Sequence, residues 1–236
     1  MNKRIWELDA FRGICVIGMV IVHLVFDLAV MYRLVEWTLP DWFLLVQNWG
    51  GVFFLLISGI SVTLGRRSLH RGVVVFGCGM LVTAVTVCMY FLGMADRGII
   101  IYFGVLQCLG VCMMVWPLFK KLPWWSLALL GTAMVVLGLW LENQPPASVY
   151  WLMPFGLPWP GFYTSDYFPL FPNLGFFLLG AALGRTLYGK KQTLFPKVNE
   201  NHPILAFLRL CGKHSLWIYL GHQPILSGIF MLLTLH

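Results

Sequence analysis

Seven long apolar stretches constrain the fold of this chain more than any other feature of its sequence. A helix needs about 20 apolar residues to cross the hydrocarbon core of a bilayer. The stretches cover residues 14–32, 49–64, 73–92, 99–119, 124–141, 170–187 and 215–235. Because 59% of the residues are hydrophobic and only 11% are charged, the composition is also that of a membrane protein. We therefore predict one domain over residues 1–236, an all-α polytopic membrane helical bundle of about seven transmembrane helices.

The distribution of Lys and Arg predicts how the helices are oriented. Alternate loops hold thirteen basic residues: Lys3, Arg4, Arg66, Arg67, Arg71, Lys120, Lys121, Arg185, Lys190, Lys191, Lys197, Arg209 and Lys213. The opposite loops hold only Arg33 and Arg97. Because cytoplasmic loops carry the excess of basic residues, we predict a cytoplasmic N-terminus and a C-terminus outside. The net charge of +7 then reflects topology, and no nucleic-acid partner is implied.

Several features point to structure and not to chemistry. The six cysteines fall mostly in apolar stretches without metal-ligand spacing, so we predict no metal site. No cleavage site follows the basic start MNKR, so the first helix is expected to remain as an anchor. Gly180 and Gly184 form a small-xxx-small pair that predicts close helix packing. Residues 204–211 have the pattern of a short amphipathic helix on the cytoplasmic face.

The loop 142–169 is long, rich in proline and aromatic residues, and free of Lys and Arg. Its tyrosines and tryptophans suit either a belt at the membrane interface or a surface on which sugars stack. Asp166 is the only acid in its second half, and it either contacts a polar substrate or lies on solvated surface.

The first apolar stretch carries ionisable residues where lipid disfavours them. Asp9 and Arg12 are three residues apart, and His23 and Asp27 are four apart, so each pair shares a face of the helix. Ionisable residues inside a span mark functional sites by default. A carboxylate one turn from an imidazole also fixes its tautomer, as a general base requires. The alternative is a buried polar pair that only holds helices together.

The last apolar stretch carries a second polar group. Ser215, Tyr219 and His222 stand at i, i+4 and i+7, so they line one stripe of a helix. His214 marks the cytoplasmic entrance, and His222 lies about 12 Å further along the helix. This depth is comparable with that of His23. His222 is open to two interpretations, a hydrogen-bonded core histidine or a functional group.

Further polar residues are candidates to line the same cavity: Ser58, Tyr102, Gln107 and Gln223. Three arginines follow the second apolar stretch: Arg66, Arg67 and Arg71. Arginines at such a position either anchor to anionic lipid headgroups or bind phosphates.

Five segments together resemble one known family: DAFRGICVIGMVIVH, GGVFFLLISGISVTLGRR, YFGVLQCLG, FPNLGFFLLGAALG and KHSLWIYLGHQPIL. The chain resembles, over nearly its whole length, bacterial membrane proteins of the heparan-alpha-glucosaminide N-acetyltransferase catalytic-domain family. The first two segments also resemble the wider group of membrane acyltransferases that O-acylate surface polysaccharides. In that group an Arg, ten residues and a His open the first spanning helix, and Arg12 and His23 match this pattern.

The resemblance implies an enzyme of the bacterial inner membrane that moves an acyl group, usually acetyl, from cytoplasmic acetyl-CoA or another acyl-CoA to a sugar or glycan acceptor on the far side. His23 would be the base, oriented by Asp27. Arg12 and Asp9 would hold the donor end of the path. The CoA phosphates would meet basic residues: Arg66, Arg67, Arg71 and Lys213 or His214. The developing oxyanion would meet hydrogen-bond donors: Tyr219, His222 and Gln107.

Two other classes of function stay open. A proton-coupled transporter or flippase would use Asp27, His23 and His222 as a proton relay, and acyl-CoA dependence separates it from an acyltransferase. A membrane scaffold would use the polar residues only to fix helix packing, and it would tolerate His23→Ala. The chain is shorter than the polysaccharide acyltransferases, so a homodimer in which a second protomer completes the site is a further arrangement.

Overall fold

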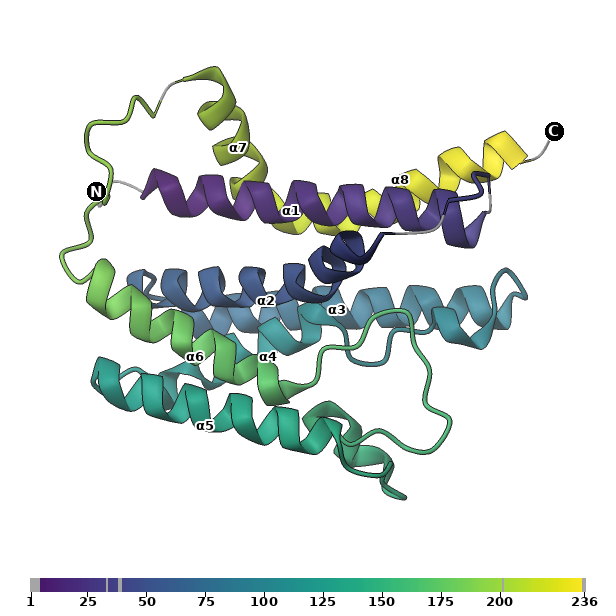
Figure 1. Cartoon of the computed structure of the whole chain (residues 1–236), viewed down its shortest axis with the longest axis horizontal. Coiled ribbons are helices and arrows are strands. Elements are labelled where there is room, and N and C mark those ends of the chain that lie inside the picture. The colour runs from purple at the N-terminus through teal and green to yellow at the C-terminus, as the bar shows by residue number, and fades with distance from the viewer. Residues whose placement is uncertain (1–4, 33, 38–39, 201, 235–236) are drawn as a thin grey trace. The chain divides into compact units, whose positions relative to one another are not determined.

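The computed structural model describes residues 5–32, 34–37, 40–200 and 202–234, which form helices and connecting loops (Figure 1). The α-helices are α1 (Trp6–Phe26), α2 (Asp41–Leu64), α3 (Ser68–Phe91), α4 (Val105–Phe119), α5 (Trp124–Glu142), α6 (Leu170–Leu187), α7 (Pro203–Lys213) and α8 (Ser215–Thr234). A π-helical turn, η1 (Asp27–Met31), extends α1. Two 3-10 turns lie in loops: η2 (Arg97–Ile99) and η3 (Tyr150–Phe155). Six residues used in the sequence predictions lie outside the described ranges: Met1, Asn2, Lys3, Arg4, Arg33 and Leu235.

Within these ranges, six helices are long and apolar enough to cross a membrane: α1 with the start of η1, α2, α3, α5, α6 and α8. They confirm the predicted all-α polytopic membrane bundle. The remaining apolar helix, α4, has 15 residues. Such a helix is about 22 Å long, whereas the hydrocarbon core is about 30 Å thick. The seven predicted apolar stretches thus correspond to six helices of spanning length and the shorter α4.

The predicted span 99–119 begins too early because the chain before α4 is extended. The Ile101 N–H donates to Thr86 Oγ1 (3.2 Å), and the Ile101 carbonyl oxygen accepts from Thr83 Oγ1 (2.7 Å). Hydroxyl groups of α3 therefore satisfy the backbone groups that a helix would bond internally. Hydropathy along the sequence does not indicate that side-chain hydroxyl groups replace the helical hydrogen bonds of this segment.

Other helices begin before the apolar stretches that predicted them. α1 begins at Trp6, and α2 begins at Asp41. Apolar composition marks only the part of a helix in hydrocarbon, whereas helical hydrogen bonding continues into the headgroup region. Asp9 and Arg12 therefore lie inside the first helix.

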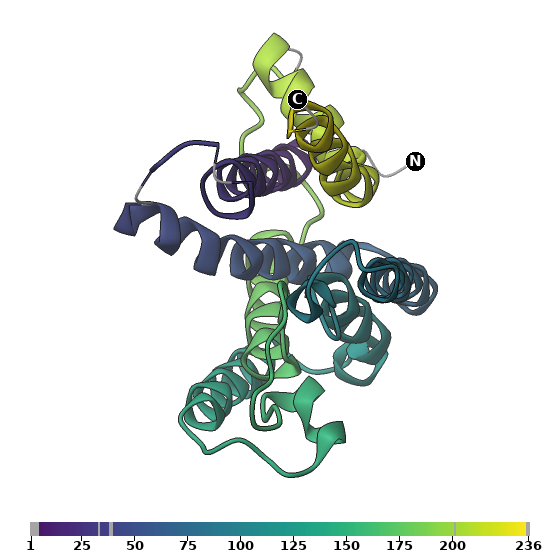
Figure 2. The same ribbon diagram turned by 90° about the vertical axis from the view of Figure 1, so that its right-hand side faces the viewer.

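The chain forms two compact units, residues 1–54 with 190–236, and residues 55–189. In the second unit α3 packs on α4, and α5 packs on α6 (Figures 1 and 2). A Cβ on Gly175 of α6 would lie 2.6 Å from the carbonyl oxygen of Gly131 in α5. Gly180 and Gly184 pack equally closely on the C-terminal part of α2, which confirms the packing role of this pair.

The loop 143–169 folds back on the start of α4. Asp166 Oδ2 accepts a hydrogen bond from the Val105 N–H (3.2 Å). The carboxylate therefore caps α4 at the end where the helix dipole favours negative charge, a role that the sequence did not indicate. Tyr167 Oη donates to the carbonyl oxygen of Met153 (2.6 Å), and burial raises the pKa of its phenol.

In the first unit, α7 packs against α1 at two glycines. A Cβ on Gly13 would overlap the carbonyl oxygen of Leu208, and a Cβ on Gly212 would overlap the carbonyl oxygen of Asp9. The two backbones are thus in direct contact, which only small residues permit. α8 follows α7 and runs beside α1 (Figures 1 and 2). The exposed apolar residues of α7, consistent with the predicted amphipathic helix, are Ile204, Phe207 and Leu210.

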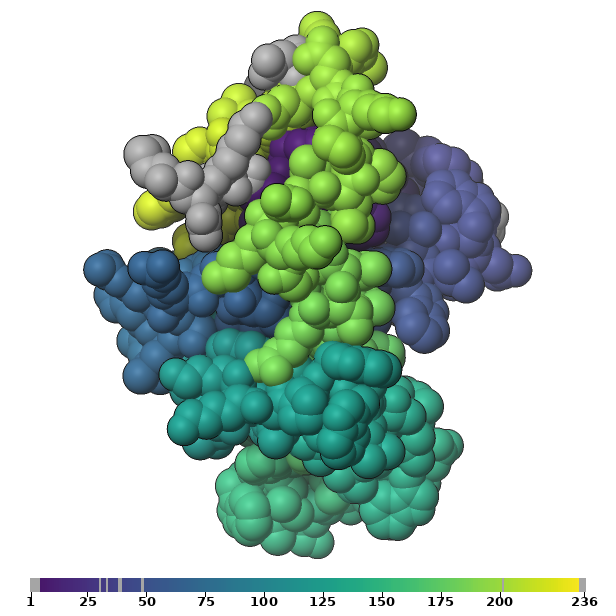
Figure 3. All heavy atoms as spheres, turned by 90° about the vertical axis from the view of Figure 1, so that its left-hand side faces the viewer, coloured from purple at the N-terminus to yellow at the C-terminus, as the bar shows by residue number. Residues whose placement is uncertain are grey.

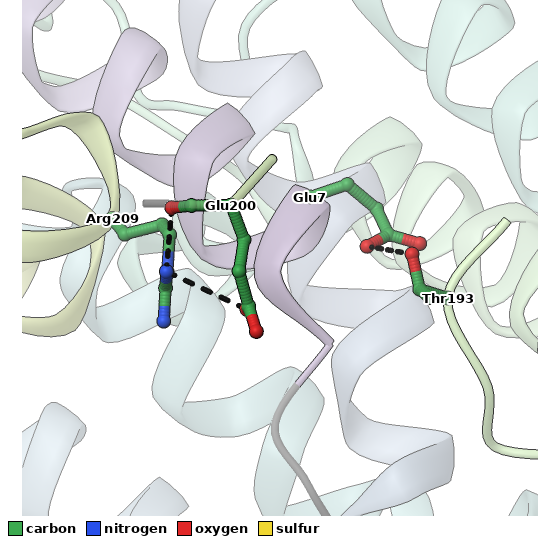
Figure 4. Close-up of polar contacts among 4 residues, drawn as sticks. All are labelled: Glu7, Thr193, Glu200 and Arg209. Atoms are coloured by element: carbon green, nitrogen blue, oxygen red, sulfur yellow. Dashed lines mark hydrogen bonds and ion pairs between the residues drawn. The ribbon is translucent and has the colours of Figure 1, made fainter. Parts of the chain in front are cut away.

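The connection 190–202 is fastened at two points (Figure 4). The Glu7 carboxylate accepts hydrogen bonds from Thr193 Oγ1 and from the Leu194 N–H, each 2.8 Å long. Arg209 of α7 donates to the carbonyl oxygen of Glu200 (2.8 Å) and lies 3.5 Å from its carboxylate. In the space-filling view of Figure 3, this connection lies over part of α1. Glu7 therefore ties a cytoplasmic loop of the predicted topology to the start of the first span.

Replacing Glu7 with alanine is expected to loosen this connection. Hydrogen bonds to a charged group contribute about 1.5–3 kcal/mol, so tryptic cleavage after Lys190, Lys191 and Lys197 should rise about tenfold or more. The measurement is the rate of cleavage of the folded protein in detergent. Glu36→Ala, at an exposed carboxylate, is the control and should leave the rate unchanged. Equal rates for wild type and Glu7→Ala would show that the contact does not restrain the connection.

Candidate functional site

Two histidines from distant parts of the chain meet between α1 and α8. His23 Nδ1 lies 2.8 Å from His222 Nε2, which is a hydrogen-bond distance. The ring centroids are 4.8 Å apart with 26° between the ring planes. Each centroid therefore lies well behind its bonded nitrogen, so the rings meet edge to edge and are not stacked face to face. The two imidazoles lie at the same depth, as their spacing in the sequence predicted.

His222 is held by its own helix. Its Nδ1 lies 2.6 Å from the carbonyl oxygen of Tyr219, three residues earlier in α8. The ring of Tyr219 also packs on the imidazole, with centroids 5.6 Å apart. His222 is 9% exposed, whereas His23 is only partly buried. His222 therefore has both nitrogens engaged, and His23 is the more accessible member of the pair.

Asp27 pairs with an amide. It is 1% exposed, and its carboxylate accepts from Gln223 Nε2 at 2.9 Å (Oδ2) and 3.2 Å (Oδ1). The sequence indicated His23 as the partner of Asp27, but His23 Nδ1 is engaged by His222. Asp27 also begins the π-helical turn η1, in which the Tyr32 N–H donates to the Asp27 carbonyl oxygen (2.8 Å). Such turns within helices are frequent at functional sites.

Gln223 presents an acceptor beside the histidine pair. Within the described chain, its Oε1 is buried and has no hydrogen-bond partner. A buried acceptor without a donor costs about 1–3 kcal/mol. Gln223 follows His222 directly in α8, and its amide contacts Asp27, which lies one turn beyond His23 in α1.

Asp9 and Arg12 form an ion pair in the first half of α1, with Arg12 Nη1 3.2 Å from Asp9 Oδ1. Arg12 and His23 are eleven residues apart, which is about three turns, so they share one face of the helix. The Arg12 and Asp9 side chains are only 14% and 8% exposed. The other candidates of the first unit lie on or just before α8: His214 is exposed, Ser215 is buried and Tyr219 is partly buried.

Six candidates lie in the second unit: Ser58, Arg66, Arg67, Arg71, Tyr102 and Gln107. Gln107 Nε2 donates to the carbonyl oxygen of Gly79 (2.9 Å) and to Thr83 Oγ1 (2.8 Å), while Oε1 accepts from the Gly104 N–H (3.0 Å). Both amide protons are thus used between α4 and α3. Gln107 is therefore a packing residue in this structure, and its amide has no proton to offer an oxyanion.

The remaining candidates of the second unit differ in exposure. Ser58 is buried in α2, one residue before the close contact of Gly59 with α6. The Tyr102 ring packs on the rings of Trp159 and Phe162, with centroids 5.5 Å and 5.8 Å away. Three arginines are exposed: Arg66 and Arg67 lie between α2 and α3, and Arg71 lies in the first turn of α3.

The sequence did not indicate two features of the site. The first is the hydrogen bond of Asp27 with Gln223, because the sequence analysis gives Asp27 as the partner of His23 and Gln223 as a residue that lines the cavity. The polar residues on the two helices were the only indication of this contact. The contact of His222 with the Tyr219 carbonyl uses the backbone, which carries no sequence signal. Among the residues that the structure describes, no group of three or more His, Cys, Asp or Glu side chains is arranged to hold a metal ion.

Comparison with protein-family models matches residues 4–224 to the family described as heparan-alpha-glucosaminide N-acetyltransferase, catalytic. The matched range includes α1 and the part of α8 that carries His222 and Gln223. No curated protein and no solved structure matches the chain.

Proposed function

The chain belongs to the heparan-alpha-glucosaminide N-acetyltransferase catalytic-domain family, and we propose that it transfers an acyl group from cytoplasmic acyl-CoA to a sugar or glycan acceptor across the membrane. The family implies membrane acetyltransferase activity in general, and the apolar helices make the protein multi-pass. The proposal adds acetyl-CoA as the donor, the acceptor class, and the bacterial inner membrane as the location.

The observation that carries the proposal is the hydrogen bond between His23 and His222, with the Asp27–Gln223 pair beside it. Acyl transfer needs a group that takes a proton from the acceptor as its oxygen or nitrogen attacks. His23 is more exposed than His222, and its Nδ1 is hydrogen-bonded to His222 Nε2. We assign it the role of base.

In the proposed step, a lone pair of the acceptor attacks the carbonyl carbon of the thioester while His23 takes the acceptor proton. The tetrahedral intermediate then expels CoA as a thiolate, which takes the proton from His23 and leaves as the free thiol. A C–O or C–N bond forms and the C–S bond breaks. Gln223 Oε1 accepts a hydrogen bond from the acceptor, and Tyr219, whose ring packs on His222, is the proposed oxyanion donor.

The donor is proposed to enter from the side of the basic loops. In the first unit, exposed cationic residues lie in the connection 190–202 (Lys190, Lys191 and Lys197) and at the end of α7 (Lys213), and the exposed His214 follows Lys213. Such groups suit the phosphates of CoA. The exposed arginines Arg66, Arg67 and Arg71 of the second unit have the same proposed role. Arg12 and Asp9 are proposed to lie on the path between the basic residues of the first unit and His23.

The proposal is tested with purified protein in sealed proteoliposomes of known orientation. Labelled acetyl-CoA is added on one side, with glucosamine as an amine acceptor or N-acetylglucosamine as a hydroxyl acceptor on the other. The expected result is acceptor-dependent release of CoA thiol together with a labelled sugar, only when the donor is on the side of the basic loops.

Three other results are informative. If the protein does not bind acetyl-CoA but moves a solute together with protons, it is a transporter and the proposed acyltransferase function is wrong. One equivalent of CoA released without any acceptor would indicate an acyl-enzyme, so His23 would be a nucleophile and not a base. Activity with the donor on either side would contradict the proposed topology.

A further inference from the structure

One backbone atom determines which groups donate and which accept in the hydrogen bonds of the two histidines. The carbonyl oxygen of Tyr219 can only accept a hydrogen bond, and it lies 2.6 Å from His222 Nδ1. His222 Nδ1 therefore carries a proton. Which ring nitrogen of a histidine is protonated is set by the bond that the other nitrogen makes.

The second contact extends this direction to His23. In a neutral His222 that is protonated on Nδ1, Nε2 bears the lone pair and accepts. Its partner at 2.8 Å, His23 Nδ1, is then the donor. A neutral His23 that is protonated on Nδ1 bears its own lone pair on Nε2. The order of donation is thus His23 to His222 to the Tyr219 carbonyl.

We propose that His222 is a positioning residue which, bonded to the backbone carbonyl of Tyr219, holds His23 in the tautomer whose Nε2 lone pair faces the acceptor. The activity part of this inference rests on the proposed function. The assignment of the tautomers rests only on the two contacts. His222 thus differs from the oxyanion donor indicated by the family resemblance, because neither of its nitrogens has a proton to offer a ligand.

The hydrogen bond between the two histidines also allows a proton taken from the acceptor to be balanced by a proton transfer from His23 to His222. When His23 Nε2 takes a proton, the ring bears protons on both nitrogens. The Nδ1 proton can then cross the 2.8 Å contact to His222 Nε2. The positive charge comes to lie on His222, whose Nδ1–H points at the Tyr219 carbonyl oxygen, the negative end of a peptide dipole. Return of the proton along the same contact restores the starting state when the CoA thiolate leaves.

The tautomers are tested directly by nitrogen NMR of protein labelled with ¹⁵N-histidine in lipid nanodiscs, with His23→Gln and His222→Gln used to assign the signals. The expected result is that both His23 and His222 are protonated on Nδ1 in wild type. A wild-type His23 protonated on Nε2 overturns the proposal. This measurement needs no substrate, so it separates the tautomer assignment from the proposed acyl transfer.

Two variants of His222 test the positioning role in the acyl-transfer assay. His222→Gln offers an amide oxygen that can accept from His23 Nδ1, and it should retain activity within about tenfold of wild type. His222→Leu offers no acceptor, and its kcat should fall about 10²-fold or more, since a base held in the wrong tautomer loses up to about 10⁴-fold. The KM for the acceptor should change little in either variant, because His222 touches no substrate.

The two arms fail in different ways. Equal losses of kcat in His222→Gln and His222→Leu would mean that filling the space matters and accepting a hydrogen bond does not, which contradicts the positioning role. The expected tautomers in a protein that transfers no acyl group would leave the hydrogen-bond order intact and remove the proposed function. If His222→Leu does not fold, the wild-type tautomers and the activity of His222→Gln still decide the question.

Discussion

Replacing His23 with alanine is expected to lower the kcat of acyl transfer about 10²- to 10⁴-fold, the usual contribution of a positioned general base. The variant should still bind acetyl-CoA, because the exposed cationic residues proposed for the phosphates lie elsewhere in the chain. The measurement is steady-state release of CoA thiol in the presence of acceptor, together with equilibrium binding of labelled acetyl-CoA.

His202→Ala is the matched control for His23→Ala. His202 is exposed, and it stands before α7 without a side-chain capping bond, so its loss should leave kcat near the wild-type value. If His23→Ala retained full activity while the protein stayed folded, His23 would not be the base, and the scaffold or packing interpretation of the polar residues would gain weight.

Replacing Gly13 with alanine is expected to destabilise the first unit by about 3 kcal/mol, the upper range for overpacking a close contact. The new Cβ would overlap the carbonyl oxygen of Leu208, and the next nearest atoms belong to the backbones of Leu208 and Gly212. Backbone atoms cannot rotate aside as a side chain can, so α7 must move away from α1. The measurement is unfolding in detergent followed by tryptophan fluorescence.

Gly18→Ala is the control for Gly13→Ala within the same helix. Apart from the chain neighbours of Gly18 and the adjacent backbone of its own helix, no atom of the described residues lies within 4 Å of a Cβ built on Gly18. Alanine is the better helix former by about 1 kcal/mol, so this variant should be as stable as wild type or slightly more stable. Similar stabilities for the two variants would show that the contact between α1 and α7 adapts to a methyl group.

The spanning helices were largely predictable because each depends on its own residues. Apolar length alone located α5 and α6, whose bounds match the predicted stretches closely. α4 was predicted too long because the chain before it bonds to hydroxyl groups of Thr83 and Thr86. That segment is extended through contacts with residues from another helix, and such contacts leave no mark in local hydropathy.

The sequence indicated the residues that the structure brings together between α1 and α8, but not which of them are partners. His23 and His222 were indicated by ionisable groups in apolar stretches, and their positions along each helix predicted a comparable depth but not the hydrogen bond between them. The spacing within α1 favoured His23 as the hydrogen-bond partner of Asp27. In the structure, the carboxylate accepts from Gln223 of α8 instead. Spacing in the sequence identifies neighbours along one helix. Which faces of two helices meet depends on how closely the helices pack, as at the contact of Gly13 and Gly212.

The separation of the partners along the chain matters for how the protein is made. His23 and His222 are 199 residues apart, and Asp27 and Gln223 are 196 apart. At synthesis rates of about 5–20 residues per second, α1 is complete roughly 10–40 s before α8 emerges from the ribosome. During that interval the first span carries an imidazole and a carboxyl group whose final partners do not yet exist. In the nascent chain α1 therefore lacks these two contacts until α8 is made, and a chain that stops before α8 never forms them.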